Sequence, residues 1–139
     1  MEQKFYNLQI DTKGQKLYEF TDLTIEWINK KNFKNGILNL SIQHTSASLI
    51  VQENADPDVQ KDLKNYFDKL VPMDDKLYIH KVEGKDDMPA HIKSALTNSH
   101  LTLSIKNKKI ILGTWQGLYL FEHRLEDHVR KISHHFIGE

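Results

Sequence analysis

The segment Gly36–Pro57, GILNLSIQHTSASLIVQENADP, decides most of the predicted fold. Its first part alternates polar residues with apolar ones, which is typical of a strand with one buried face, at Leu38, Leu40 and Ile42. The apolar run at residues 49–51 predicts a second strand, and the two strands are expected to meet at residues 44–48. Asp56-Pro57 then predicts the start of a helix, because aspartate caps a helix well and the missing N–H of proline has no partner at the first helical position.

The flanking sequence extends this pattern in both directions. Upstream, period-two spacing predicts a strand at residues 6–10, and apolar residues at helical intervals predict a helix at residues 17–32. Downstream, the helix that begins at Pro57 is expected to end at Pro72, and Pro89 is expected to open a second, short helix. Further strands are predicted at residues 76–82, 101–105, 110–112, 118–121 and 129–136. We therefore expect residues 1–139 to form a single α+β domain, with an antiparallel β-sandwich-like core and a few helices packed to one side.

The composition argues against several classes of function. The chain has 139 residues, which is long enough to bury a core without disulfides or a structural metal. Its 19 basic and 19 acidic residues cancel, so we expect no broad positive surface for nucleic acid. It contains no cysteine, which excludes disulfides and thiolate ligands, and no apolar run of the roughly 20 residues that a membrane helix needs. We expect a soluble, cytoplasmic protein that binds neither nucleic acid nor membrane.

Three polar stretches of the sequence each contain a histidine, namely His44, His80 and His91. Three neutral imidazoles with a vacant fourth position form the ligand set of a catalytic zinc site, so we predict a divalent metal, zinc in the first instance. His91 is expected to be the third residue of the helix opened by Pro89, where the positive end of the helix dipole favours a neutral ring. The gaps of 36 and 11 residues match no local metal motif, and the alternative is that each is a surface or hydrogen-bonded histidine.

Four further polar residues are candidates for catalytic work. Glu83 and Glu122 are the carboxylates best suited to act as a general base or to orient a ligand histidine. Glu122 shares a face with the apolar residues of its strand, so it points either into a polar site or out to solvent at the end of the strand. Asp56 is a weaker candidate, because capping the helix already explains it. Asn54 lies between strand and helix and has no evident capping duty.

The segment Gly113–Gly117 combines two glycines with three polar or aromatic residues, Thr114, Trp115 and Gln116. Exposed backbone N–H groups at Gly113, beside a hydroxyl and an amide, can hold a phosphate, and an indole can stack on a flat heterocycle. Thr45, in the stretch HTSAS, is grouped with these residues as a substrate contact. The alternative is a β-hairpin in which the glycines form the turn and the tryptophan fills the core.

Four stretches, HTSASL, ENADPDVQ, EGKDDMPAHIKSAL and LGTWQGLYLFE, resemble in sequence and order the YjbQ-like family, whose members are often labelled secondary thiamine-phosphate synthases. The resemblance spans residues 36–132. It implies a β-sandwich-like α+β fold, a homotrimer, and a polar pocket near the subunit contacts in which His44, His80 and His91 hold the metal. Two places depart from the family pattern: Asn98 stands where relatives usually have glycine, and the tail HRLEDHVRKI lacks a Gly-Pro turn.

The function that the resemblance implies is the joining of hydroxymethylpyrimidine diphosphate to thiazole phosphate with release of pyrophosphate, as a main or a side activity. The metal and the segment Gly113–Gly117 would stabilise the pyrophosphate, and Trp115 would stack on the pyrimidine. Two alternatives stay open. One is a metal-dependent hydrolase of a phosphorylated or acylated small molecule, with Glu83 or Glu122 as base, and the other is a non-catalytic module that binds a metal or an anion. In each case the expected ligand is a small phosphorylated or anionic molecule.

Overall fold

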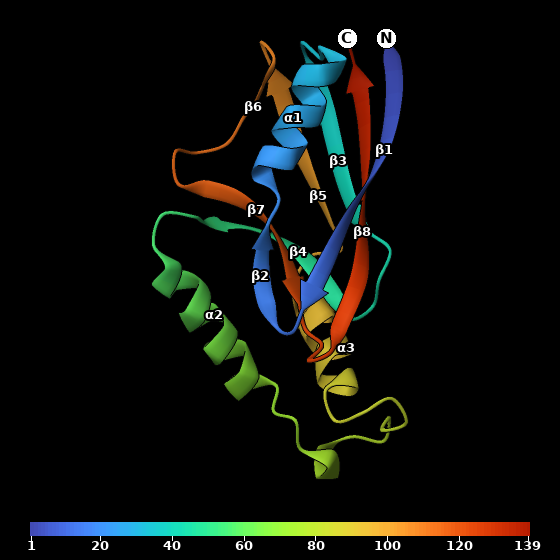
Figure 1. The fold of residues 1–139 in the computed structure, drawn as a ribbon, viewed down its shortest axis with the longest axis vertical. Coiled ribbons are helices and arrows are strands. Elements are labelled where there is room, and N and C mark those ends of the chain that lie inside the picture. Colours follow the sequence, from blue (N-terminus) through green and yellow to red (C-terminus); the bar gives the residue numbers. More distant parts are fainter.

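The computed structural model describes residues 1–139 and contains three α-helices and eight strands (Figure 1). The strands are β1 Glu2–Lys13, β2 Lys16–Glu19, β3 Gly36–Ile42, β4 Ala47–Glu53, β5 His100–Lys106, β6 Lys109–Ile110, β7 Gln116–Glu122 and β8 Asp127–Gly138. The helices are α1 Thr21–Lys31, α2 Pro57–Leu70 and α3 Asp87–Leu96, with a short 3₁₀ turn at Asp75–Leu77. None of these helices combines the length and the apolar character that crossing a membrane requires.

All strand pairs are antiparallel, and they form two sheets. The five-stranded sheet has the order β1-β8-β3-β5-β6, and the three-stranded sheet has the order β2-β7-β4. The two longest strands, β1 and β8, pair over their whole length, from Glu2 with Gly138 to Lys13 with Asp127. Because β3 and β4 belong to different sheets, residues 43–46 carry the chain from one sheet to the other.

The main core lies between the inner face of the five-stranded sheet and a layer made of α1 and the three-stranded sheet (Figure 1). The five-stranded sheet contributes alternate apolar residues, among them Leu38, Leu40, Ile132 and Phe136. From the opposite layer come Trp27 and Ile28 of α1 and Leu49, Leu118 and Leu120 of β4 and β7. This burial fixes the pairing register, because a slip of one residue would turn the buried leucines of β3 out to solvent.

The helix α2 covers the other face of the three-stranded sheet. Asp56 caps it by accepting a hydrogen bond from the N–H of Asp58 at 2.9 Å, and Pro57 is its first residue. Leu63 and Phe67 pack against a small apolar cluster of the sheet, Leu17, Tyr119 and Phe121. Since both faces of this sheet are covered, β7 is buried at every position from Gly117 to Glu122.

The predicted α+β fold with an antiparallel sandwich-like core is confirmed, but several predicted elements are wrong in detail. Residues 76–82 form no strand, because the apolar residues that suggested one, Ile79 and Val82, are 101% and 94% exposed and meet no neighbouring strand. The helix expected at residues 17–32 begins at Thr21, since residues 16–19 pair with β7 as β2. The strand expected at residues 110–112 covers only Lys109–Ile110.

The register between β4 and β7 sorts the candidate residues into two groups. Ala47 lies opposite Glu122 at one end of this pair, and Glu53 lies opposite Gln116 at the other end. A strand of seven residues is about 20 Å long. We call the first the histidine end, which contains His44, Thr45 and Glu122. We call the second the tryptophan end, which contains Asn54, Asp56 and residues 113–116.

Candidate metal centre at the histidine end

The helix α3 delivers two polar side chains to the histidine end. It begins at Asp87, two residues before Pro89, so Pro89 is its third residue and not its first. Proline is tolerated there because the first four N–H groups of a helix have no partner within it. His91 is consequently the fifth residue of α3 and lies one turn after Asp87 on the same helix face.

Asp87, His80 and His91 converge on one point. The Nε2 atoms of His80 and His91 lie 2.7 and 3.1 Å from Oδ2 of Asp87. One possible ligand atom from each of the three residues lies within 4.8 Å of the other two. Asp87 is buried, His91 is partly buried, and His80 is exposed on the loop before α3. Two imidazoles and one carboxylate at this spacing are a ligand set that zinc and related divalent metals accept.

The second ring nitrogen of His91 determines what the first can do. Nδ1 of His91 lies 2.8 Å from the carbonyl oxygen of Thr45, which can only accept, so Nδ1 carries a proton. In a neutral ring Nε2 then presents a lone pair to the carboxylate of Asp87, and two acceptors face each other. A second proton on the ring or a cation between the two groups relieves this conflict. A histidine whose other N–H donates to a backbone carbonyl is also the usual arrangement of a metal ligand.

Arg124 holds the cluster from the other side. Its Nη1 donates to Oδ1 of Asp87 at 2.8 Å, and its Nε donates to Asp86 at 2.9 Å. Its Nη2 donates to the carbonyl oxygen of Glu83 at 2.8 Å, which ties the loop before α3 to the segment after β7. The carboxylate of Glu83 itself is exposed. Oδ1 of Asp87 is therefore occupied by arginine, whereas Oδ2 faces the two histidines.

Both aspartates at the start of α3 are held as carboxylates. Burial raises the pKa of Asp87, but the hydrogen bond from His80 and the charges of His91 and Arg124 outweigh burial and lower that pKa below its ordinary value. Burial likewise raises the pKa of Asp86, and hydrogen bonds from the Leu125 N–H and Arg124 lower it by more. A carboxylate that stays ionised is suited to bind a cation and is unsuited to donate a proton.

His44 lies outside this cluster. Its Nε2 accepts a hydrogen bond from the backbone N–H of Lys131 at 3.0 Å, so the lone pair that a metal would need is already used. Burial lowers the pKa of His44, and the charge of Arg130 lowers it further, so the ring is neutral. The predicted set of three histidines is thus not brought together, because Asp87 occupies the place that His44 was expected to take. His44 and His91 do line one hollow of about 390 Å³, together with Thr45, Ser94, Ala95, Thr97 and Ser99.

Glu122 is an internal anchor at this end. It is fully buried, and its Oε1 accepts from Nε of Arg130 at 2.8 Å and from the hydroxyl of Thr12. Its Oε2 accepts from Nη2 of Arg130 and from the N–H of His123. Burial raises the pKa of Glu122, but the bonds from Arg130 and Thr12 outweigh burial and lower it. With both oxygens occupied, Glu122 is placed to position Arg130, and this arrangement does not favour a role as accessible base.

The candidates at the tryptophan end surround a tight connection between the two sheets. The N–H of Gly113 donates to Oε1 of Gln116 at 2.7 Å, and the N–H of Gln116 donates back to the Gly113 carbonyl at 3.1 Å. Asn54 donates its backbone N–H to the carbonyl of Trp115 at 2.9 Å. Thr114 is exposed and Trp115 is 62% exposed, so the alternative that Trp115 fills the core is wrong. The segment is not a hairpin either, because β6 and β7 belong to different sheets.

Three residues of the histidine end were missed from the sequence, namely Asp86, Asp87 and Arg124. The spacing of Asp87 and His91 is the i,i+4 pair of a helix, and it becomes visible once the helix is allowed to begin before Pro89. No comparable local pattern points to Arg124, since its partners are 37 to 41 residues away in the sequence.

Comparisons with known proteins point to one family. The family model described as "UPF0047 protein YjbQ-like" matches residues 6–139. A UPF0047 protein of Synechocystis sp. is 47% identical over 132 residues, which are 95% of this chain and 90% of that protein. The UPF0047 protein YjbQ of Escherichia coli O157:H7 is 46% identical over 75% of each chain.

Solved structures agree with this result. An uncharacterised YjbQ/UPF0047 family protein from Clostridium acetobutylicum has a TM-score of 0.80 and 31% identity, covering 96% of this chain and 99% of its own. A YbjQ-like protein of unknown function from Sulfolobus solfataricus has a TM-score of 0.86 over 99% of this chain and 100% of its own, at 20% identity, which concerns the fold alone. The names of these proteins state a family and no reaction.

Proposed function

The chain belongs to the YjbQ-like UPF0047 family, and we propose that His80, Asp87 and His91 form a divalent metal centre, zinc in the first instance, at which a small phosphorylated or anionic molecule reacts. The observation that supports this most directly is the orientation of His91. Its Nδ1–H is committed to the Thr45 carbonyl, and its Nε2 faces an ionised carboxylate at 3.1 Å. Either a second proton on the ring or a cation between the two groups resolves that contact, and we propose the cation because His80 faces the same carboxylate oxygen.

The ligand set favours a centre that is open to substrate. Two imidazoles and one carboxylate are three protein ligands, the number that catalytic zinc sites use while leaving a further position vacant. His80 is exposed and Asp87 is buried, so the centre lies at the protein surface with one side toward solvent. When bound there, a divalent metal supplies Lewis-acid polarisation of a phosphoryl or carbonyl oxygen.

The chain's own groups have separate duties around this centre. The Thr45 carbonyl fixes the ring of His91, and Arg124 fixes the carboxylate of Asp87 through the oxygen that does not face the histidines. The adjoining hollow, lined by His44 and His91, offers space for a small molecule within the range of ligand sites. Its other polar groups are hydroxyls, which can hydrogen-bond to a phosphate or sugar-like oxygen.

Thiamine-phosphate synthesis is the specific reaction that the family resemblance implies. Within one chain, however, Trp115 lies at the far end of β7 from Glu122, about 20 Å along the strand. A pyrimidine stacked on Trp115 would therefore not reach the cluster of the same chain. In the homotrimer that the resemblance also implies, the tryptophan end of a second subunit would have to supply that contact.

Metal-dependent hydrolysis of a phosphorylated or acylated small molecule is the second candidate, and it needs only the histidine end. Glu83 is the carboxylate available as a base, because its side chain is exposed while its backbone is held on Arg124. Glu122 is unavailable for this duty, since both of its oxygens are bonded inside the protein. Hydrolysis needs only groups that lie together within one chain, so the arrangement supports hydrolysis more simply than it supports synthesis.

Calorimetric titration of metal-stripped protein with zinc tests the centre itself. We expect His80→Ala and His91→Ala each to weaken zinc binding by roughly 100-fold or more, because even the outer partners of metal ligands are worth 10- to 100-fold. The matched control is His100→Ala, which removes an exposed histidine outside the cluster and should leave the affinity unchanged. Equal zinc affinity in all four proteins would exclude this metal centre.

Two assays on zinc-loaded protein separate the candidate reactions. One measures pyrophosphate release from hydroxymethylpyrimidine diphosphate with thiazole phosphate, and the other measures phosphate release from p-nitrophenyl phosphate. Hydrolysis predicts activity in the second assay that Glu83→Gln reduces and Trp115→Ala leaves intact. Synthesis predicts activity in the first assay that Trp115→Ala reduces, in a protein that sediments as a trimer. Synthase activity in a stable monomer would contradict the two-subunit route.

A further inference from the structure

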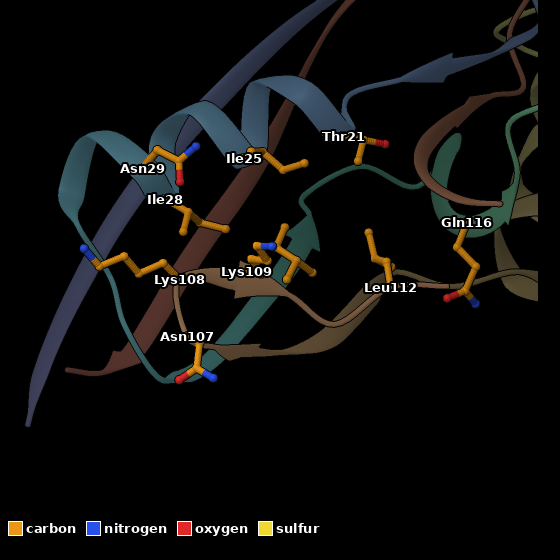
Figure 2. A pocket seen from close by; sticks show the side chains of 10 residues that line it. Thr21, Ile25, Ile28, Asn29, Asn107, Lys108, Lys109, Leu112 and Gln116 are labelled. Carbon is orange, nitrogen blue, oxygen red and sulfur yellow. The ribbon is translucent and has the colours of Figure 1, made fainter. Parts of the chain in front are cut away.

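A second cavity, of about 620 Å³, extends from the tryptophan end along α1 and shares no lining residue with the metal centre (Figure 2). The helix α1 forms one wall, and residues 107–112 form the opposite wall, with Gln116 at one extremity (Figure 2). The volume falls within the range of small-molecule sites. Because Gln116 and Glu122 stand at opposite ends of β7, this cavity is separate from the histidine end.

The lining of this cavity has two chemical parts. Four apolar side chains come from both walls, namely Ile25, Ile28, Ile110 and Leu112. The remaining residues are all polar or basic, and they include Lys108 and Lys109. No acidic residue lines the cavity. An apolar interior with cations and amides at its edge is complementary to a molecule with an apolar body and an anionic group.

The cations at the edge are free to bind a ligand. Neither Lys108 nor Lys109 takes part in any of the ion pairs of the protein. Gln116 accepts a hydrogen bond from Gly113 through Oε1, which leaves its amide NH₂ group available as a donor. The hydroxyl of Thr21, in contrast, is already engaged with Glu19 and with the N–H of Leu118. The lining thus has unused donors at Lys108, Lys109 and Gln116.

Lys108 holds its position at a conformational cost. Asn107 and Lys108 form the two-residue connection between β5 and β6, with φ values of 52° and 67°. Positive φ at both positions defines a turn in which Asn-Gly is strongly preferred, so Asn107 fits and Lys108 occupies the usual place of glycine. Hydrogen bonds from the Lys108 N–H to the Lys34 carbonyl and from the Asn107 N–H to the side chain of Asn35 hold the turn in place. The turn thus places a basic residue, in a backbone conformation that favours glycine, beside a cavity without acids.

We propose that this cavity binds a small amphipathic anion, with the apolar body between α1 and residues 110–112 and a carboxylate or phosphate at Lys108 and Lys109. The site is additional to the proposed metal centre and does not depend on it. The occupant is a free small molecule, because the site is a concave cavity between one helix and one short hairpin.

Calorimetric titration of the intact protein with three probes tests the chemistry of the ligand. The probes are decanoate, decyl phosphate and decanol, which share an apolar chain and differ in charge. We expect the two anions to bind more tightly than decanol by roughly fivefold or more at low salt, since an exposed ion pair contributes up to about 1 kcal/mol. Added salt should weaken the two anions and leave decanol unchanged. Equal affinity for all three, or no binding, would overturn the proposal.

Single variants assign the site. Lys109→Ser should weaken decanoate binding by roughly fivefold. Lys108→Gly should do the same and should also raise the melting temperature, because glycine relieves the positive φ. The matched control is Lys106→Ser on β5, which removes an exposed lysine that does not line the cavity and should leave binding unchanged. An equal loss of decanoate affinity in Lys106→Ser and Lys108→Gly would show that only the overall charge matters, and it would contradict the assignment of the cavity as the binding site.

Ile25→Asp distinguishes the other possible occupants. Ile25 is 37% exposed, so an aspartate there can be accommodated and should abolish decanoate binding by placing a negative charge in the cavity wall. Sedimentation of this variant and the original protein shows whether a second copy covers the cavity. The proposal would be overturned if the original protein forms an oligomer that Ile25→Asp dissociates and if the original protein does not bind decanoate. Lysine-dependent sedimentation with phosphatidylglycerol vesicles would overturn it in favour of a lipid surface.

Discussion

The two ends of the β4–β7 pair differ in how the charged groups near them are paired. At the histidine end the charged groups are paired within the chain: Arg124 is bonded to Asp86 and Asp87, and Glu122 to Arg130. The cavity that begins at the tryptophan end is edged at its far extremity by Lys108 and Lys109, which have no ionic partner (Figure 2). The histidine end directs a carboxylate oxygen and two imidazoles at one point, which suits a cation, whereas the cavity offers cations and amide donors, which suits an anion.

This difference in pairing indicates which of the two regions has its side-chain geometry fixed before a ligand binds. Pairing at the histidine end holds the side chains of the cluster by partners of their own chain, as the Thr45 carbonyl holds His91 and Arg124 holds Asp87. Such preorganisation is what a metal site requires, because ligand positions must be set to within a fraction of an ångström. Lys108 and Lys109 are long, exposed side chains that no ion pair of the chain holds, so the cavity is expected to bind more weakly and with less geometric selectivity.

The largest effect is expected from the buried ion pair that supports the histidine end. Glu122→Gln leaves the guanidinium of Arg130, which is 4% exposed, without its carboxylate, and breaking a buried pair in this way costs about 3 to 5 kcal/mol of unfolding free energy. Urea denaturation measures the change. Asp58→Asn, which removes a partner of an exposed pair, should change stability little and serves as the control.

The double variant Glu122→Gln with Arg130→Met sharpens this prediction. Replacing both partners removes the uncompensated charge, so part of the lost stability should return. If Glu122→Gln alone costs no more than Asp58→Asn, the view that pairing fixes the histidine end is wrong.

The next effect is stabilisation by zinc. A ligand that binds only the folded chain at about 100 times its dissociation constant adds about 2.7 kcal/mol to the unfolding free energy. We expect this gain in the original protein and in Lys108→Gly, whose change lies in the β5–β6 turn, outside the histidine cluster. Asp87→Asn should lose the gain, because the amide removes the charge that faces both histidines. Thermal melts with and without zinc measure this gain. If zinc still raised the melting temperature of Asp87→Asn, the proposed metal centre would be wrong.

The fold was predicted well from the sequence, because the core strands carry local patterns: period-two alternation in the five-stranded sheet and continuous apolar runs in β4 and β7. Leu38 and Leu40 mark the buried face of β3 without reference to any other segment. The strand expected at residues 76–82 failed for the opposite reason: Ile79 and Val82 are apolar but exposed, and sequence spacing does not reveal whether a neighbour covers them. The resemblance to the family agreed with the overall architecture, yet it gave no boundary for α3.

The site was predicted only in part, because convergence depends on register. His80 and His91 were identified by residue type, whereas Asp87 was missed when the helix was placed two residues too late. His44 is a suitable ligand by type, but the Lys131 N–H occupies its Nε2, and no local pattern shows that contact across 87 residues. The separation of Trp115 from the histidines follows from the pairing of β4 with β7, which only the folded structure reveals.

Mild acid should act on the histidine end through His123. Burial, the largest cause, acts together with the charges of Lys93 and Arg130 and lowers the pKa of this ring from 6.5 to about 3. The unfolded chain therefore takes up a proton near pH 6.5 that the folded chain refuses until about pH 3. Stability is full above pH 6.5 and falls as pH decreases, by about 1.4 kcal/mol per unit and hence about 2 kcal/mol by about pH 5.

Urea denaturation at a series of pH values measures this dependence. His123→Gln cannot take up the proton and should give a flatter profile between pH 6.5 and about pH 5. His100→Ala, which changes an exposed histidine, should keep the slope of the original protein. An unchanged slope in His123→Gln would assign the acid response to other groups, such as buried His134, whose pKa burial lowers to about 4.

The smallest effect is expected from Trp115→Ala at the tryptophan end. The side chain is 62% exposed, and the hydrogen bond that Trp115 accepts from Asn54 uses its backbone carbonyl, so the change should alter the unfolding free energy by less than about 0.5 kcal/mol. Trp27→Ala is the contrasting variant, since Trp27 is 6% exposed within the main core and its loss should cost about 3 to 5 kcal/mol.

A large exposed indole that contributes little to stability is available for a partner, either a stacked ring or a second subunit. Sedimentation and ligand titration of the same variant separate these two uses. Loss of an oligomer would assign the indole to a subunit contact. Weaker binding of a phosphorylated heterocycle in an unchanged assembly would assign it to stacking, which is worth roughly 1 to 3 kcal/mol. A loss of stability as large as that of Trp27→Ala would instead show that the tryptophan end is as tightly built as the core.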